Sequence, residues 1–322
     1  MVLNSRAMTS FCALPPESRL ADVPDSAAAY ALAALGLIIS ERAGVLNLTA
    51  EGLMLVGAMS GIGACLTFGG QPELALLVAM LAAAVTSLLF AMMVVILRVN
   101  QVISGLAIVF FCQGLTNLVG NLAGWQNKPV TGLLHVYIPW LSDLPVVGRI
   151  LFSQNLVIYL TIPIFFLVSY ALRNSMAGLR LRAVGENPEA ADAAGISVAA
   201  TRFLAIAAGS ALIGLAGGLL AVGGVKVWVA DITGGRGWIA VALVIFARWQ
   251  PWRALAGALL FGCIESLIPR IAAAGIQAPQ YFMLMLPYII TLAVMVWSGL
   301  SKRAVSEEPG ALGRAFVREE RR

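Results

Sequence analysis

Long apolar runs, separated by short polar turns, follow one another along most of the chain. An α-helix needs about 20 apolar residues to cross the hydrocarbon core of a bilayer. Residues 74–97 and 203–225 reach that length without a charged side chain, so we predict a membrane-spanning helix for each. The other candidate spans are residues 27–40, 52–68, 102–120, 156–172, 238–247, 255–268 and 281–300.

Two of these runs, residues 27–40 and 238–247, are short for a complete crossing. Either is a candidate for a broken or re-entrant helix, which is stable at membrane depth where protein or a cavity surrounds it. The pattern predicts an all-α fold, a polytopic transmembrane helical bundle of about 8 to 10 spans. We expect residues 1–26 to form an N-terminal segment, residues 27–300 the transmembrane domain and residues 301–322 a tail.

The composition supports a membrane protein. Hydrophobic residues make up 60% of the chain and charged residues only 11%, whereas a soluble domain has about 25% charged residues. The net charge of +5 comes from Lys and Arg beside the apolar runs, where positive charge marks the cytoplasmic side, and does not indicate nucleic-acid binding. The single histidine, His135, excludes a histidine-rich metal site, and we expect no cofactor.

Arginine is distributed unequally among the polar intervals. Residues 173–202 and the tail after Leu300 are rich in it, whereas residues 121–153 carry only Lys128 and Arg149. Lys and Arg accumulate in cytoplasmic loops. We therefore expect residues 173–202 and the C-terminus in the cytoplasm, together with the turns at residues 98–101 and 248–253, and residues 121–153 outside.

The interval around residues 178–202 contains a short segment with its own helix-end signals. Asn187 is a preferred N-cap residue, Pro188 suits the first helical position, and Gly195 suits the left-handed position after the helix. A helix of about two turns is too short to be stable alone. It is either a loop helix packed on its own bundle or a protruding helix that docks on a cytoplasmic motor domain. In the second case the small side chains of Ala190, Ala191 and Ala194 would allow close approach.

Four motifs in register resemble one protein family. They are "ISERAGVLNLTAEGLMLVGAMSG" (39–61), "LRVNQVISGLAI" (97–108), "GLRLRAVGENPEAADAAGI" (178–196) and "GGRGWIAVALVIFARWQPWRALAGALLFG" (234–262). Together they resemble the permease subunits of ATP-binding cassette (ABC) importers, in the family of ribose and branched-chain amino acid permeases. The nearest branch is that of nucleoside and simple-sugar permeases.

The resemblance implies an inner-membrane permease subunit with several partners. These are an ATPase subunit, a second related permease, an extracytoplasmic substrate-binding lipoprotein and the surrounding membrane lipid. It also implies that the capped segment is the cytoplasmic coupling helix. The residues to which it assigns ATPase coupling are Gly185, Glu186, Asn187, Pro188, Ala190, Ala191 and Gly195. This chain reads "LNLTAEG" where the family more often reads "LNIGLEG", so Thr49 stands in place of a small glycine.

Two polar groups are candidates for the substrate path. Asn47 and Glu51 stand at a helix junction, either as interfacial charges and caps or as hydrogen-bonding groups for sugars and nucleosides. Asn100, Gln101 and Ser104 stand at the start of a span, where capping is the alternative role.

Three classes of function are compatible with a polytopic membrane protein. The leading one is the ABC permease subunit. The chain has no G-x-x-x-x-G-K-[ST] loop, so ATP would have to be bound by a partner. The alternative is an ion- or proton-coupled secondary transporter, which would call for acidic residues in mid-span, and only Glu265 lies well inside an apolar run. A membrane enzyme is disfavoured, because no catalytic constellation is evident and we assign no catalytic residue.

Overall fold

The computed structural model describes residues 23–137, 152–273 and 308–317, with a few single positions between residues 285 and 296. Helices dominate these residues. They are α3 (Val23–Glu41), α4 (Ala50–Thr67), α5 (Pro72–Ala91), α6 (Gln101–Leu122), α8 (Leu156–Asn174), α9 (Met176–Glu186), α10 (Pro188–Ala193), α11 (Val198–Gly218), α12 (Arg236–Ala247) and α13 (Pro251–Ala273). The π-helical segments η1 (Met92–Ile96) and η2 (Leu219–Val225) extend α5 and α11. One antiparallel ladder joins β1 (His135–Tyr137) to β2 (Ser153–Asn155).

The predicted all-α membrane bundle is confirmed. Within the described residues, 6 helices are long and apolar enough to cross a membrane, and α12 is a shorter apolar helix. The prediction of a short or broken first span is wrong, because α3 is a continuous helix of 19 residues. The last predicted span, residues 281–300, lies outside the described residues except for single positions.

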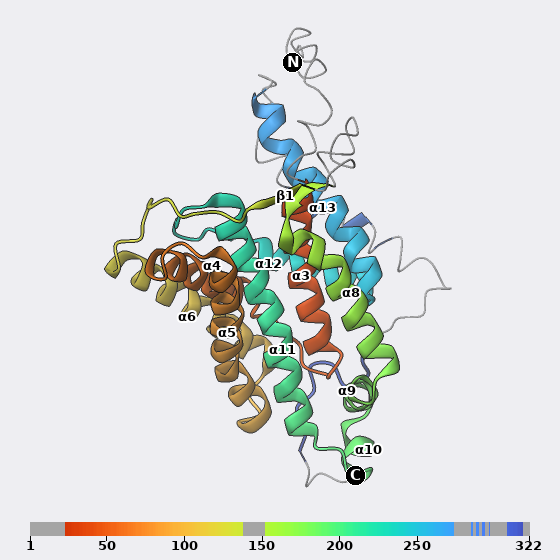
Figure 1. Cartoon of the computed structure of the whole chain (residues 1–322). Coiled ribbons are helices and arrows are strands. Elements are labelled where there is room, and N and C mark those ends of the chain that lie inside the picture. The colour runs from red at the N-terminus through yellow and green to blue at the C-terminus, as the bar shows by residue number, and fades with distance from the viewer. Residues whose placement is uncertain are drawn as a thin grey trace.

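Helices α3 and α11 lie side by side at the centre of the bundle, with α5 and α6 on one side and α8 and α13 on the other (Figure 1). In the most apolar stretch of α3, 83% of residues are buried, against 28% in α8. The central pair is close because glycines face each other. A Cβ on Gly36 would lie 2.3 Å from the carbonyl oxygen of Gly209. Small residues are a common means of helix association in membranes, where the hydrophobic effect does not favour contact between helices.

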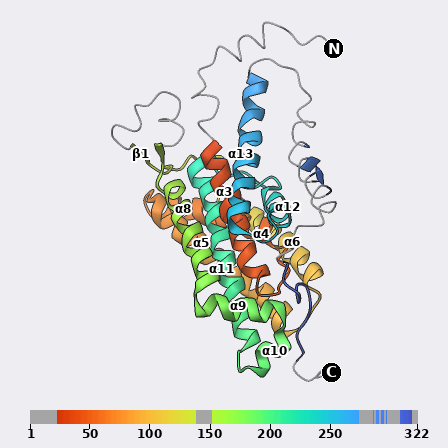
Figure 2. The same ribbon diagram turned by 90° about the vertical axis from the view of Figure 1, so that its right-hand side faces the viewer.

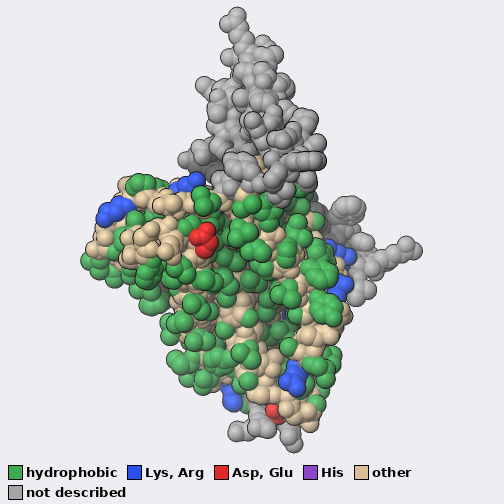
Figure 3. All heavy atoms as spheres, viewed as in Figure 1, with side chains coloured by type: hydrophobic (Ala, Val, Ile, Leu, Met, Phe, Trp, Pro, Cys, Tyr) green, Lys and Arg blue, Asp and Glu red, His purple; other side chains and the backbone are tan. Residues whose placement is uncertain are grey.

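The same close approach recurs between α4 and α11. A Cβ on Gly57 would lie 2.3 Å from the carbonyl oxygen of Gly214. The outer surface is different, since large apolar side chains cover the middle of the face in Figure 3 and charged groups lie towards its edges. Among the described residues as a whole, the large apolar side chains of Leu81, Phe110 and Phe166 are exposed and suit contact with lipid.

The predicted cytoplasmic intervals meet at one end of the bundle, which we call the basic end. It comprises the turns after α3, η1, α8, α9, α10 and α12 together with residues 308–317. Arg42 donates from Nε and Nη2 to the carbonyl oxygen of Trp249, and Ala311 N–H donates to the carbonyl oxygen of Gly185. Figure 2 shows α9 and α10 at this end and β1 at the other.

At the opposite end, residues of the predicted external segment contact the turn after η2. Val130 N–H donates to the carbonyl oxygen of Lys226, and Asn127 N–H donates to that of Trp228. The segments predicted to share a side of the membrane therefore share an end of the bundle.

Candidate functional sites at the basic end and at half depth

Local hydrogen bonds define the short helix α10. Asn187 Oδ1 accepts from the N–H of Ala190 at 2.9 Å, and Pro188 occupies the first turn. At the other end Gly195 adopts a φ of +81°. Gly195 N–H donates to the carbonyl oxygen of Asp192 and Ile196 N–H to that of Ala191, which is the hydrogen-bond pattern of a Schellman cap. The predicted caps of this helix are confirmed.

Helix α10 is seated on its own bundle by one face. Ala191 is 4% exposed and belongs to a small apolar cluster with Val184 and Val198. Gly185 is also buried, and a Cβ there would lie 2.1 Å from the carbonyl oxygen of Arg42. The prediction that Ala191 faces a partner protein is therefore wrong. Gly185 is likewise buried within the chain.

The opposite face of the turn is open. Its exposed residues are Glu186, Asn187, Glu189, Ala190, Ala193, Ala194 and Gly195. Helix periodicity alone does not say which side of a two-turn helix meets its own chain. The structure assigns Ala191 to the inner side and leaves Ala190 and Ala194 outside.

Helix α4 begins deep inside the bundle. A Cβ on Gly52, near its start, would lie 2.9 Å from Cα of Val109 in α6. Helix α6 starts at Gln101 at the basic end, so Val109 lies about 12 Å into the bundle at 1.5 Å per residue. The non-helical residues 45–49 that lead to α4 are largely buried, as membrane depth requires of irregular backbone.

Glu51 joins the start of α4 to the start of α12. Its Oε1 accepts from Oγ1 of Thr233 at 2.6 Å and from the N–H of Gly235 at 2.9 Å. Its Oε2 accepts from the N–H of Gly237 at 2.6 Å. A carboxylate is favourable at a helix N-terminus, where free N–H groups give partial positive charge. Glu51 thus fixes α12 at half depth.

An ion pair lies beside this junction. Arg236 donates from Nε to Oε1 of Glu265 at 2.8 Å, and its Nη2 contacts the same oxygen. Oε2 of Glu265 accepts from the hydroxyl of Tyr30 at 2.6 Å. The side chains of Arg236 and Glu265 are 26% and 24% exposed. Charged groups at this depth are stable when they are paired and face the bundle interior or water, and they commonly mark a substrate path.

From this junction α12 runs to the basic end. It has 12 residues, or about 18 Å at 1.5 Å per residue, which is well short of a hydrocarbon core of about 30 Å. At its far end Nε1 of Trp249 donates to Oε2 of Glu41 at 2.5 Å. The prediction of a short span at residues 238–247 is therefore confirmed.

The predicted path residues fall into separate groups. Asn47, four residues before Glu51, is buried. Its side chain donates a hydrogen bond to Oγ of Ser40 and accepts from the N–H and hydroxyl groups of Thr49. Asn100, Gln101 and Ser104 lie at the basic end instead. The side chain of Asn100 accepts from the N–H groups of Val102 and Ile103, which is the capping alternative.

Sequence patterns did not single out Arg236 or Tyr30. Arg236 stands in the glycine-rich stretch at residues 234–237, whose sequence is typical of a flexible hinge, and Tyr30 stands in an apolar run. Of the three residues, only Glu265 is conspicuous in the sequence, because it is an acidic residue inside an apolar segment. Such a charge requires a partner, but its sequence position does not reveal which one.

Comparison with known proteins places these features in a family. Residues 21–295 match the family model described as the permease component of branched-chain amino acid transport systems. The guanosine ABC transporter permease protein NupQ of Bacillus subtilis is 36% identical over 308 residues, covering 92% of this chain and 95% of NupQ. The nucleoside ABC transporter permease protein NupC of Lactococcus lactis is 34% identical, covering 81% of this chain and 86% of NupC. A candidate glucose ABC transporter permease protein of Haloferax volcanii, TsgC13, is 37% identical, covering 89% of this chain and 94% of TsgC13.

Proposed function

Because this chain belongs to the family of permease components of branched-chain amino acid transport systems, we propose that its half-depth site carries nucleosides or related purines and simple sugars. The chain is a multi-pass permease subunit of an ABC transporter in the inner membrane. One observation carries the substrate proposal. A partly exposed pair, Arg236 and Glu265, lies where two helices begin inside the bundle.

The chemistry of this site suits an uncharged, hydroxyl-rich solute. A guanidinium donates to ring and hydroxyl oxygens, and a carboxylate accepts from hydroxyl and amino groups. Helix starts near the bilayer midplane form the substrate sites of many secondary transporters, and this chain has helix starts at a similar depth. Glu51 and Asn47 do not face the substrate in this proposal. They hold the chain around the site in place, because both are buried and hydrogen-bonded within the chain.

The same geometry disfavours proton coupling through Glu265. Both of its oxygens are occupied by hydrogen bonds from Arg236 and Tyr30. A proton carrier would have to break these bonds in each transport cycle. Family membership favours the ABC permease independently of this geometry.

We further propose that energy reaches this site from a separate ATPase subunit that docks on the exposed face of α10. A second permease and an external substrate-binding lipoprotein complete the importer. Glu186, Asn187, Pro188, Ala190 and Gly195 form or frame the docking face, whereas Gly185 and Ala191 seat the helix on its own bundle. Residues 301–322 form a cytoplasmic tail in this arrangement, and the transmembrane domain begins with α3 at Val23.

The topology gives a direct prediction. In a variant whose four native cysteines are replaced, Ala193→Cys should react with an impermeant maleimide only after the membrane is opened. Lys128→Cys, exposed at the opposite end, should react in intact cells. Labelling of Ala193→Cys in intact cells would show that the basic end faces outward.

The function is tested by uptake in membrane vesicles that contain the permease pair, the ATPase and the binding protein. Uptake of a radiolabelled nucleoside should require ATP and persist when an uncoupler removes the proton gradient. Ala190→Trp should lower uptake about tenfold and weaken co-purification of the ATPase, because a large ring on the docking face obstructs an interface in which a few central residues carry most of the energy.

Ala191→Trp is the matched comparison on the inner face. It should lower the melting temperature of the permease itself, since overpacking a buried site commonly costs about 1–3 kcal/mol. Normal ATPase binding and normal uptake in Ala190→Trp would remove the coupling role from α10. Uptake that follows the proton gradient at constant ATP would remove the ABC mechanism.

A further inference from the structure

Residues 308–317 cross the basic end and contact the end of α9, next to α10. We call them the C-terminal strap. Ala311 N–H donates to the carbonyl oxygen of Gly185 at 2.9 Å, and Gly310 N–H donates to Oε2 of Glu186 at 3.3 Å. The strap is therefore bonded to the last residues of α9, immediately before α10 begins.

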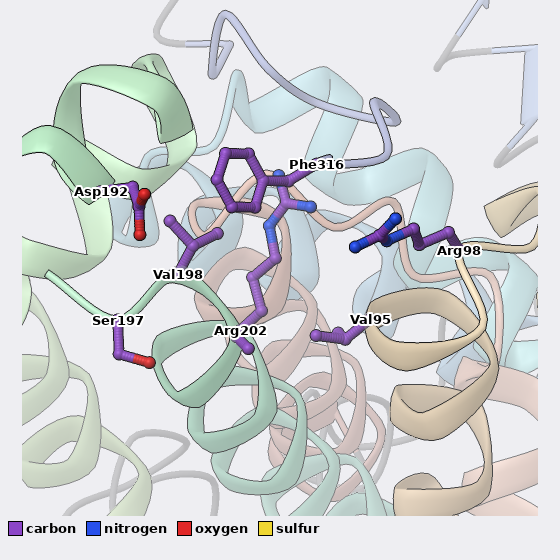
Figure 4. Close-up of a pocket in the computed structure, with 8 residues that line it drawn as sticks. Val95, Arg98, Asp192, Ser197, Val198, Arg202 and Phe316 are labelled. Carbon is purple, nitrogen blue, oxygen red and sulfur yellow. The ribbon is translucent and has the colours of Figure 1, made fainter. Parts of the chain in front are cut away.

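Apolar side chains of the strap occupy two different clusters. Phe316 packs against the cluster that contains Ala191 and seats α10, and Leu312 packs against the main core. Figure 4 shows Phe316 between α10 and the side chains of Arg202 and Arg98. The strap thus touches both the coupling helix and the transmembrane bundle.

Two buried side chains bind the strap to the chain segment that follows α3. Arg202, 1% exposed, donates from Nη1 to the carbonyl oxygen of Arg314 at 3.2 Å and from Nε to that of Ala43 at 3.3 Å. Gln101 donates from Nε2 to the same Arg314 oxygen at 3.5 Å, and its Oε1 accepts from the N–H of Leu46 at 2.6 Å. Each side chain therefore bridges the strap and residues 43–46.

Residues 43–46 lead directly to the half-depth site. Asn47 follows them, and Glu51 holds the start of α12. The seat of the strap is also incompletely filled. A cavity of about 230 Å³ lies beside Arg98, Val198 and Phe316, and one of about 250 Å³ separates the strap from the start of α10. The strap is thus held by a few hydrogen bonds and by two apolar side chains, beside space into which it can shift.

We propose that the C-terminal strap links α10 mechanically to the half-depth site, with Arg202 and Gln101 as positioning residues that hold it to residues 43–46. A displacement of α10 by the ATPase is carried through Gly185 and Glu186 to the strap, and through Arg202 and Gln101 to the segment before α4. The proposal rests on the function proposed above, and it adds a transmitting element to it.

The test compares a chain ending at residue 307 with one ending at Val317. The first lacks the strap, and the second lacks only the residues after it. In the vesicle assay the chain ending at residue 307 should still bind the ATPase, because the exposed face of α10 is intact. Its uptake per ATP hydrolysed should fall about tenfold, a typical size for coupling between sites. The chain ending at Val317 should match the wild type.

Full-length Arg202→Met tests the same link without shortening the chain. It should show the same lowered ratio of uptake to hydrolysis, and Arg202→Lys should restore part of it. Hydrogen exchange at residues 43–46 should quicken in Arg202→Met and in the chain ending at residue 307, which reports the lost link independently of transport.

An unchanged ratio of uptake to ATP hydrolysis in Arg202→Met and in the chain ending at residue 307 would overturn the link. Loss of ATPase binding by the chain ending at residue 307 would also overturn it, because the strap would then be part of the docking face. If the wild type and the chain ending at Val317 both fail to take up substrate with ATP, the proposed function fails instead. The hydrogen-exchange result then still decides whether the strap holds residues 43–46.

Discussion

Gly57→Ala should leave little stably folded permease. The added Cβ would lie 2.3 Å from the carbonyl oxygen and 2.8 Å from Cα of Gly214, and both are backbone atoms of α11. No rotamer change relieves such a clash, so α4 and α11 must separate. Overpacking costs about 1–3 kcal/mol where side chains can adjust, and we expect at least about 3 kcal/mol here. The melting temperature of purified protein in detergent measures the loss.

Gly114→Ala is the control for this substitution. Gly114 lies in α6, and apart from the adjacent backbone of that helix no atom of the described residues lies within 4 Å of the position of its missing Cβ. Alanine is favoured over glycine in a helix by about 1 kcal/mol, so this variant should melt at or above the wild-type temperature. Equal melting temperatures for the two variants would show that the α4–α11 contact is looser than the structure indicates.

Glu265→Gln should abolish most of the uptake. The amide cannot supply two charged oxygens to Arg236 and Tyr30, and the guanidinium loses its counter-charge at half depth. A charged side chain in the centre of a membrane costs about 2.5–3.5 kcal/mol by insertion scales. That corresponds to roughly a hundredfold in an equilibrium constant. Uptake of nucleoside and the yield of folded protein should both be measured.

A double substitution separates a structural role from a transport role. Arg236→Met with Glu265→Met removes both charges together, so neither charge is left without its partner, which is the costly case for an ion pair shielded from bulk water. The double variant should regain the wild-type yield of folded protein, but its uptake should stay low because the groups that face the substrate are gone. Recovery of uptake together with yield would contradict a place on the path.

Local chemistry explains why the short helix α10 was predictable. Asn187, Pro188 and Gly195 act on neighbours a few residues away, so the caps of α10 are encoded in one short segment. The face of α10 was not predictable in the same way. Ala191 is buried by Val184 and Val198, and an alanine-rich turn shows no apolar side that would indicate this.

The half-depth site shows the limit of sequence patterns more clearly. Tyr30 and Glu265 are 235 positions apart, and Glu51 and Thr233 are 182 apart. Hydrophobic periodicity locates spans but not the contacts between them. Glu51 was a candidate from its place at a helix junction, yet its partners at the start of α12 follow only from the packing of α4 against that turn.

The brevity of α12 has a consequence for how the protein is made. A helix of 12 residues that begins with an arginine is too short and too polar at one end to insert efficiently into the bilayer by itself during synthesis. The N–H groups at its start donate hydrogen bonds to Glu51, and Trp249 after its other end donates to Glu41. Glu41 and Glu51 are synthesised about two hundred residues before these partners. The early helices must therefore be in place in the bilayer before α12 can settle between them. Premature chain termination before α12 leaves the buried carboxylates of Glu51 and Glu41 without these partners, so we expect such fragments to be less stable than the full chain.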